Sequence, residues 1–390
     1  WGVKKFLVIC ISRILIRMNY FLKNISKKVA QFFLVIFILF LGVSVEAATI
    51  TVDDGTSTVA TDTACSIREA IENANDNATT NVDCTAGSGT DTIDITVDIS
   101  LDVIDHDYMA LPAPTEAIIL QGNNHSITRI GVTDMDLLDE PEDITIQELS
   151  ISGFSRNSGN TGSGLIECIN SNCRIVLTDV EFINNTDGVI DSDISTGAGE
   201  WIFTNVTLLN NSSTTGGIMH SGFARNITIT NLTATGNSSS SGIDGGILTY
   251  TGAGSGIIEI SDSLFSDNST HGFGAALGVS LYGGVTTVNI NNTTFESETS
   301  DNSGGDLSIE GNNVSLNIDS SLFNGGIANS NGGAIYIQDT VSTTITNSTF
   351  YNNTAITGNG GAIYVGDGGL TTGSFHASHN TFYNNSAGSN

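Results

Sequence analysis

The side chains of this chain that could do chemistry are mainly carboxylates. Asp187, in the run Asn185-Thr186-Asp187-Gly188, could act as a catalytic acid, and acidic clusters occur at 134–136, 139–140 and 142–143. Such groups can protonate a glycosidic oxygen or hold calcium beside a uronic acid. β-Elimination from a uronate also needs a cationic partner, and the chain after residue 47 has no lysine and only five arginines. These are Arg68, Arg129, Arg156, Arg174 and Arg225. The acidic clusters are interpreted as a solvated loop; calcium is possible, but no ligand is assigned.

The run around Asp187 resembles the aspartate-bearing motif of polygalacturonase-type hydrolases. That resemblance implies further partners, namely an adjacent pair of aspartates, a Gly-His-Gly and an Arg-x-Lys. The sequence has no Gly-His-Gly and no lysine after Lys28. Asp187 also falls at a corner of the repeat described below. A structural turn is therefore favoured, and Asp187 remains a weak catalytic candidate.

Four cysteines follow residue 47, namely Cys65, Cys84, Cys168 and Cys173. An even number of cysteines in an exported chain favours disulfides, and sequence order suggests Cys65 with Cys84 and Cys168 with Cys173. Zinc is the alternative, but neither pair has the two-residue gap of a zinc site and no histidine lies at finger spacing. We expect two disulfides and no zinc.

The histidines do not form a recognisable site. His376 and His379 are three residues apart, a spacing that points to opposite faces of a strand. His379 takes a position three before a repeated phenylalanine, which Asn or Asp holds in most other copies. We interpret it as a polar corner residue, and His220 and His271 are left unassigned.

The chain that would position these residues repeats from about residue 144 onward, with a period near 28. One large apolar slot recurs at intervals of 26 to 32 residues: Phe154, Phe182, Leu208, Ala234, Phe265, Phe295, Phe323, Phe350 and Phe382. Residues five and seven before the slot are mostly apolar, and the residue four before it is polar. This period of two indicates a strand with one buried face and excludes helical solenoids.

Each copy continues past the slot into a polar corner. The third residue after the slot is asparagine in six of eight copies, whereas the copy Phe295-Glu296-Ser297-Glu298 departs from the pattern. A glycine pair then precedes a second apolar strand, as in Gly332-Gly333-Ala334-Ile335. Two strands and a corner per repeat, without hairpin signals, favour a parallel β-helix with asparagine side chains stacked along the corner. A propeller blade would need 40 or more residues and hairpins.

A short helix is expected before the repeats. Ser66 and Glu69 form a capping box, and Ile67, Ala70, Ile71 and Ala74 mark one apolar face. Such a helix could cover the open end of a solenoid. The run Cys65-Ser66-Ile67-Arg68-Glu69-Ala70-Ile71 resembles the CSLREA-type N-terminal domain of bacterial exported proteins, which implies that the repeats form a right-handed parallel β-helix in a surface or secreted protein. The later Gly-Gly-Ala-Ile and Phe-x-Asn-Asn runs resemble repeats of polymorphic outer membrane proteins.

The first 47 residues read as upstream sequence and a signal peptide. Lysines follow Met18, an apolar run covers 32–43, and Val45-Glu46-Ala47 offers a cleavage site. Without this segment the chain has five arginines and 40 acidic residues, a net charge of −35. Such a charge disfavours nucleic acid and anionic membranes. We expect three segments: residues 1–47, an N-terminal cap at 48–92, and a β-helix at 93–390 that ends within a repeat.

These observations favour an exported, acidic, all-β protein at the cell surface or outside the cell. It would act as a structural module that contacts glycans or a neighbouring cell surface, without catalysis and without inserting its β-helix into a membrane. The alternative is a polysaccharide lyase or glycoside hydrolase acting on polyuronates. That alternative lacks the set of catalytic partners described above.

Overall fold

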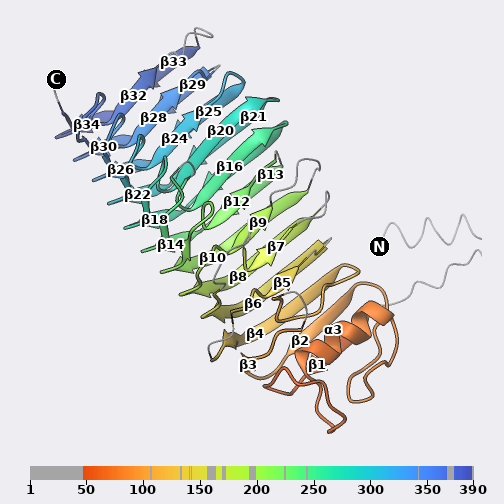
Figure 1. The fold of residues 1–390 in the computed structure, drawn as a ribbon. Coiled ribbons are helices and arrows are strands. Elements are labelled where there is room, and N and C mark those ends of the chain that lie inside the picture. Colours follow the sequence, from red (N-terminus) through yellow and green to blue (C-terminus); the bar gives the residue numbers. More distant parts are fainter. Residues whose placement is uncertain are drawn as a thin grey trace, which may run out of the picture. The chain divides into compact units, whose positions relative to one another are not determined.

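The computed structural model describes residues 47–390 except 106–107, 132–133, 140, 142, 156–163, 169–172, 193–198, 224, 243–244, 341, 367–372 and 389–390. The expected signal segment, Arg156 and the loop inside the Cys168–Cys173 pair lie outside the described residues. Within the unit Ala47–Asn390 the chain forms a parallel β-helix of about nine turns, as the repeat predicts (Figure 1).

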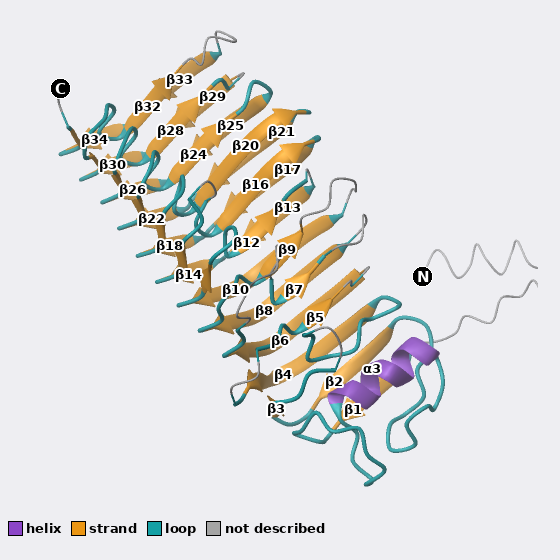
Figure 2. Ribbon diagram, in the orientation of Figure 1, coloured by secondary structure: helices purple, strands orange, loops and turns teal. Residues whose placement is uncertain are grey.

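The strands form three sheets that run along the stack (Figure 2). The 19-stranded sheet contains β1 (Thr49–Val52), β2 (Asp91–Ile95), β3 (Ile99–Leu101), β4 (Ile118–Arg129), β6 (Asp143–Ser152), β8 (Arg174–Ile183), β10 (Glu200–Leu209), β13 (Asn226–Thr230), β14 (Thr233–Thr235), β17 (Gly256–Ser261), β18 (Leu264–Ser266), β21 (Thr286–Asn291), β22 (Thr294–Glu296), β25 (Val314–Asp319), β26 (Leu322–Asn324), β29 (Ser342–Thr346), β30 (Thr349–Tyr351), β33 (Ser374–Ser378) and β34 (Thr381–Tyr383). The seven-stranded sheet contains β11 (Ser212–Ser213), β15 (Ser238–Ser239), β19 (Ser269–Thr270), β23 (Thr299–Ser300), β27 (Ile327–Ala328), β31 (Thr354–Ala355) and β35 (Ser386–Ala387). The nine-stranded sheet contains β5 (Leu138–Asp139), β7 (Ile166–Glu167), β9 (Ile190–Ser192), β12 (Met219–Ser221), β16 (Leu248–Ala253), β20 (Leu277–Gly283), β24 (Leu307–Glu310), β28 (Ile335–Gln338) and β32 (Ile363–Gly366).

Equivalent residues of successive coils stack directly on one another. Ile290, Ile318 and Ile345 are paired in register across β21, β25 and β29, and each side chain is at most 1% exposed. The alternate residues on these strands face outward, and Asn317 Nδ2 donates a hydrogen bond of 3.0 Å to Asn289 Oδ1 in the preceding coil. The apolar columns of the sequence are therefore the interior of the helix, as predicted.

The repeated phenylalanines form a continuous stack inside the coils. The ring centroids of Phe265, Phe295, Phe323, Phe350 and Phe382 are 4.7–5.1 Å apart, and the ring planes differ by 4–11°. Stacked rings of this kind add to the stabilisation that comes from burial. Phe382, in the last described coil, is 51% exposed.

The prediction that placed Phe154 in this slot is wrong. The parallel pairing of β6 with β8 sets Ile151 beside Phe182. Phe154 lies three residues further on, where its backbone N–H donates to Asn185 Oδ1 over 3.0 Å. Both Ile151 and Phe154 are buried, so hydrophobicity alone could not distinguish them, whereas the hydrogen bond to the corner asparagine fixes the register.

The corners of each coil require left-handed backbone. In eight successive coils, one residue of the 19-stranded-sheet segment has a positive φ. It lies in the middle of β8 and β10, and between the two strands that each later coil contributes to this sheet: Asp179, Asn205, Asn231, Asp262, Asn292, Ser320, Asn347 and His379. Short polar side chains tolerate this conformation because they can bond to nearby backbone. His379, with a φ of 57°, is a corner residue, as its place in the repeat indicates.

A second polar column lies inside the next corner and joins the coils. Asn211 Oδ1 accepts hydrogen bonds from the backbone N–H and the Nδ2 of Asn185, both over 3.0 Å, and Asn211 Nδ2 donates to Phe182 O and to Asn237 Oδ1. The same bonds recur at Asn237 and Asn268. We call this column the amide ladder: Asn185, Asn211, Asn237 and Asn268, then Asn353 and Asn385. It confirms the stacking that the sequence predicts.

The helix α3 (Ile67–Asp76) packs on β1 and β2, at the first coil (Figure 1). Its capping box between Ser66 and Glu69 is present, and the apolar face that the sequence predicts is buried. β1 pairs in parallel with β2, so the stack of strands already begins at Thr49. The next strands along the chain, β2 and β3, are separated by residues 96–98.

The phenylalanine stack yields a prediction for stability. Phe323→Ala should lower the free energy of unfolding by about 3–5 kcal/mol, because it removes a buried ring between two stacked neighbours. Leu322→Ala, on the same strand but 36% exposed, is the matched control and should cost less than about 1 kcal/mol. Urea denaturation followed by circular dichroism measures both, and equal losses would contradict a continuous interior stack.

Candidate functional site

The outer side of the nine-stranded sheet carries the most varied polar and aromatic side chains of the coils. In β12, β16, β20 and β24 the inward residues include Met219, Leu248, Leu277 and Leu307, and the residues that follow them point away from the core. The outward residues stack in two columns, which we call the nine-stranded face. The first column is Asp191, His220, Thr249, Gly278, Ser308, Tyr336 and Tyr364, and the second is Thr251, Ser280, Glu310, Gln338 and Gly366.

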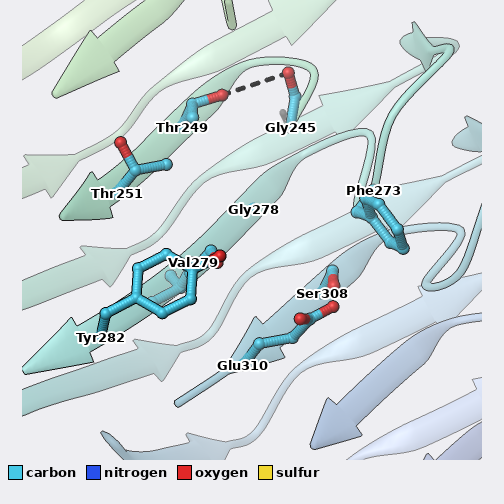
Figure 3. A pocket seen from close by; sticks show the side chains of 10 residues that line it. Gly245, Thr249, Thr251, Phe273, Gly278, Val279, Tyr282, Ser308 and Glu310 are labelled. Carbon is cyan, nitrogen blue, oxygen red and sulfur yellow. Dashed lines mark hydrogen bonds between the residues drawn. The ribbon is translucent and has the colours of Figure 1, made fainter. Parts of the chain in front are cut away.

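A pocket of about 130 Å³ opens on this face over β16, β20 and β24 (Figure 3). Its floor is low because Gly278 has no side chain between Thr249 and Ser308. A Cβ on Gly278 would lie only 2.8 Å from Gly245 Cα, so the adjoining turn also requires glycine there. The walls combine hydroxyls, aromatic rings and one carboxylate: Thr249, Thr251, Phe273, Ser280, Tyr282, Ser308 and Glu310.

Tyr282 is the most exposed large side chain of the pocket, with 87% of its surface accessible. It follows the last inward residue of β20, and Figure 3 shows it on β20, with Ser308 and Glu310 on the neighbouring strand. Thr249 Oγ1 already donates to Gly245 O over 3.2 Å. An exposed ring next to a carboxylate and hydroxyls can stack on an apolar ring face and bond to hydroxyl groups around it.

The carboxylate of this pocket is partly buried. Burial raises the pKa of Glu310, the charge of Asp339 raises it further, and a hydrogen bond with Ser308 opposes the shift. On the next strand, burial, together with the charges of Glu310, Tyr364 and Asp339, raises the pKa of Tyr336 to about 12. The Tyr336 hydroxyl donates to Gln338 Oε1. Ionisable groups whose pKa values are shifted by burial and by nearby charges are characteristic of functional sites, although structural networks of charges shift pKa values too.

Aromatic and ionic pairs extend the face on both sides of the pocket. The rings of Tyr336 and Tyr364 stack with centroids 5.5 Å apart. On the other side, His220 Nδ1 lies 2.8 Å from Asp191 Oδ1, and His220 Nε2 lies 3.5 Å from Thr251 Oγ1. His220 and Glu310 are three strands apart, which corresponds to roughly 14 Å at the spacing of neighbouring strands. That separation is too long for the paired groups of a glycosidase.

Asp187, the catalytic candidate from the sequence, lies at a corner away from these columns. Its backbone has a φ of 77°, its carboxylate accepts a hydrogen bond from Thr214 Oγ1 over 2.9 Å, and its side chain is buried. Gly188 continues the turn with a φ of 92°. This geometry supports the interpretation of Asp187 as a turn residue, while its catalytic role stays a prediction.

The arginines that the structure describes are engaged in holding the coils together. Arg68 Nε donates to Ala110 O, and Arg129 Nη1 donates to Gly153 O, each over 2.8 Å. Arg174 lies between Asp143 and Glu200 of the neighbouring coils, with N–O distances of 3.2 and 3.5 Å. Arg225 is buried over the Trp201 ring, where burial lowers its pKa to about 10. Each of these four is thus already in contact with a backbone carbonyl, a carboxylate or an aromatic ring.

The cysteines pair as sequence order suggests, Cys65 with Cys84 and Cys168 with Cys173. Among the described residues, no group of three or more His, Cys, Asp or Glu side chains gathers as a metal site would require. Likewise, no described helix has the length and apolar character needed to cross a bilayer.

Sequence reasoning identified the coils that carry the nine-stranded face but not the pocket in it. Glu310 is paired with Ser280 and Gln338 in the adjacent coils, so the outward residue changes from coil to coil and no repeated residue type marks the pocket. The signal that could have found them is the alternation within Leu277–Gly283 and Leu307–Glu310, where outward positions carry serine, tyrosine and glutamate.

Glu310 offers a test of the cost of holding a charge in this pocket. Because its pKa is raised in the folded state, its ionisation reduces stability once the pH exceeds its ordinary value of 4.5. Glu310→Gln should therefore raise the urea midpoint at pH 8 and leave it unchanged at pH 4. Glu259→Gln, at an exposed position of β17, is the control and should show no such difference. An unchanged midpoint for Glu310→Gln at pH 8 would contradict the environment described.

Comparison of the chain with protein-family models, curated proteins and solved structures found no match. The resemblances to CSLREA-type domains and to outer membrane protein repeats therefore remain expectations from the sequence.

Proposed function

We propose that this protein is an exported structural rod that binds neutral polysaccharide along its nine-stranded face. The observation that carries the proposal is the pocket at Tyr282, where an almost fully exposed ring lies beside a carboxylate and several hydroxyls. Sugar rings present apolar C–H faces and equatorial hydroxyls, so they are matched by an aromatic surface with polar groups at its edge.

The charge of the chain favours a neutral ligand over an acidic one. After residue 47 the sequence has 40 acidic residues and five arginines, and the four described arginines are held in structural contacts. A surface with this excess of negative charge repels polyuronates, as it repels nucleic acids. The same property argues against the alternative of a lyase or hydrolase acting on polyuronates.

Repetition supports a binding role in which many weak contacts add up. Each successive strand of the nine-stranded face adds outward residues to its columns. Tyr336 and Tyr364 place an aromatic ring at the same position in adjacent coils. A long polysaccharide could lie across several coils at once, so that each contact raises the effective concentration for the next. The two disulfides support an oxidising location outside the cytoplasm.

Substitution of the exposed ring tests the proposal. Tyr282→Ala should weaken binding to a neutral polysaccharide by up to about tenfold, the loss expected for one aromatic stacking contact. Tyr351→Ala, at an exposed stacked tyrosine of the 19-stranded sheet, is the control and should bind like the wild type. Depletion of the protein from solution by a panel of insoluble neutral polysaccharides measures the affinities.

Two results would contradict the proposal. The first is that Tyr282→Ala binds as strongly as the wild type to every polysaccharide that depletes the wild type from solution. The other is the release of reducing ends or unsaturated products from polyuronates, with or without calcium, that disappears in Asp187→Ala. The second result would establish the enzymatic alternative.

A further inference from the structure

The amide ladder is interrupted in the coil that contains β22, β23 and β24. Glu298 stands where the preceding coils have asparagine, and the following coil has Gly326 at this position. In the same coil as Glu298, Asp306 precedes β24 and takes an inward position that is alanine in adjacent coils, as at Ala276 and Ala334. Three departures from the repeat thus occur within two neighbouring coils.

Glu298 and Asp306 are enclosed in the interior with most of their oxygens unpaired. Glu298 Oε1 accepts hydrogen bonds from the backbone N–H and the Nδ2 of Asn268, over 3.2 and 2.8 Å, as a ladder asparagine does. Glu298 Oε2 and both carboxyl oxygens of Asp306 have no hydrogen-bond partner, and both side chains are 0% exposed. Buried polar atoms are rarely left in this state.

Gly326 leaves the space that the Asp306 carboxyl occupies. A Cβ at Gly326 would lie 2.7 and 2.9 Å from the two carboxyl oxygens of Asp306, and 2.8 Å from the carbonyl oxygen of Gly333. An asparagine at 326 would therefore collide with Asp306. The Asp306 carboxyl takes the place of the missing ladder side chain, with a backbone carbonyl beside it, so the three departures compensate one another.

In the part of the chain that the structure describes, no cationic side chain is found to influence these two carboxyls. The charged groups that influence them are acidic: burial raises the pKa of Glu298 to about 8 with a contribution from Asp267, and burial and Glu298 raise the pKa of Asp306. On the same coil, Glu310 belongs to the outer face, and Asp301, 3.6 Å from His271, lies at the surface. A calcium ion would require six to eight oxygen ligands, and among the described residues no third acidic side chain joins the pair.

We propose that Glu298 and Asp306 are held as neutral carboxylic acids that replace the amides of the ladder, so that this coil is a pH-sensitive joint in the rod. A carboxylic acid, like a carboxamide, has an acceptor oxygen and a donor group. Glu298 Oε2–H donates toward Asp306, the direction in which each ladder amide donates to the next coil. In this proposal the Asp306 hydroxyl donates toward the carbonyl oxygen of Gly333, which, like the Asp306 carboxyl, lies within 3 Å of the Cβ position at Gly326.

Ionisation then opposes folding at this coil. Both carboxyls are ionised in the unfolded chain at neutral pH, so folding takes up protons and stability depends on pH. For Glu298, stability is greatest below its ordinary pKa of 4.5 and falls as the pH rises toward about 8. The pKa of Asp306 is also raised well above its ordinary value by burial and by the charge of Glu298, so its ionisation adds to this loss of stability as the pH rises.

The test compares the wild type with Glu298→Gln/Asp306→Asn, which keeps the shapes but cannot ionise. Urea denaturation between pH 6 and 8 should show the wild-type folding constant falling by up to about tenfold per pH unit for each carboxyl. The double variant should lose that dependence. Glu296→Gln, at an exposed position of β22 in the same coil, is the matched control and should keep it. A wild-type slope in the double variant would overturn the proposal.

Infrared spectroscopy of the wild type gives a second readout that needs no variant to fold. Folded protein at pH 7 should show the carbonyl stretch of a protonated carboxyl, and unfolding at the same pH should abolish it. Absence of this band in the folded protein would overturn the proposal. Stoichiometric binding of calcium from a CaCl₂ titration, lost in the double variant, would also overturn it and would assign the pair to a metal ion.

Discussion

Each coil of this protein must hydrogen bond through its backbone to the coils on either side, and that constraint determines what every column of the sequence can contain. Parallel pairing in register places like residues about one strand spacing apart along the axis. Side chains that interact well with copies of themselves are therefore favoured: flat aromatic rings, branched aliphatic groups and carboxamides. The phenylalanine stack and the amide ladder are two results of this one requirement. The left-handed corners are a third, because a coil closes where a residue that tolerates this backbone, most often asparagine, aspartate or glycine, forms the turn.

Much of the fold could be predicted from the sequence because this constraint acts on each repeat in the same way. The inward columns through Ile290 and Leu316, the corner at His379, the capping box of α3 and both cysteine pairings follow from local patterns that recur or are self-contained. Phe154 was misplaced because two buried apolar residues three positions apart fit the slot equally well in sequence. Only the hydrogen bond from Phe154 N to Asn185 Oδ1 distinguishes them.

The candidate sites were harder to predict because they depend on departures from the repeat. The pocket at Tyr282 needs a glycine in one outward column, where the adjacent coils have Thr249 and Ser308, so it has no periodic signal. The substitution of Glu298 for asparagine was visible in the sequence, but its relation to Asp306 and Gly326 was not, because the three residues meet only across two coils. In a stacked structure, a residue that breaks its column must be accommodated by its neighbours above and below. Such compensated departures are where function and sensitivity to conditions can be sought.

The register of the coils is the central claim, and cross-linking tests it most directly. Asn289 and Asn317 are outward partners on β21 and β25, and Thr344 is the next residue in that column. Disulfides form readily only when the two Cα atoms are within about 7 Å of each other. Under mild oxidation, Asn289→Cys/Asn317→Cys should cross-link efficiently, whereas Asn289→Cys/Thr344→Cys, two coils apart, should not. Cross-linking of the second pair in preference to the first would contradict the parallel, in-register stack on which the rest of this account depends.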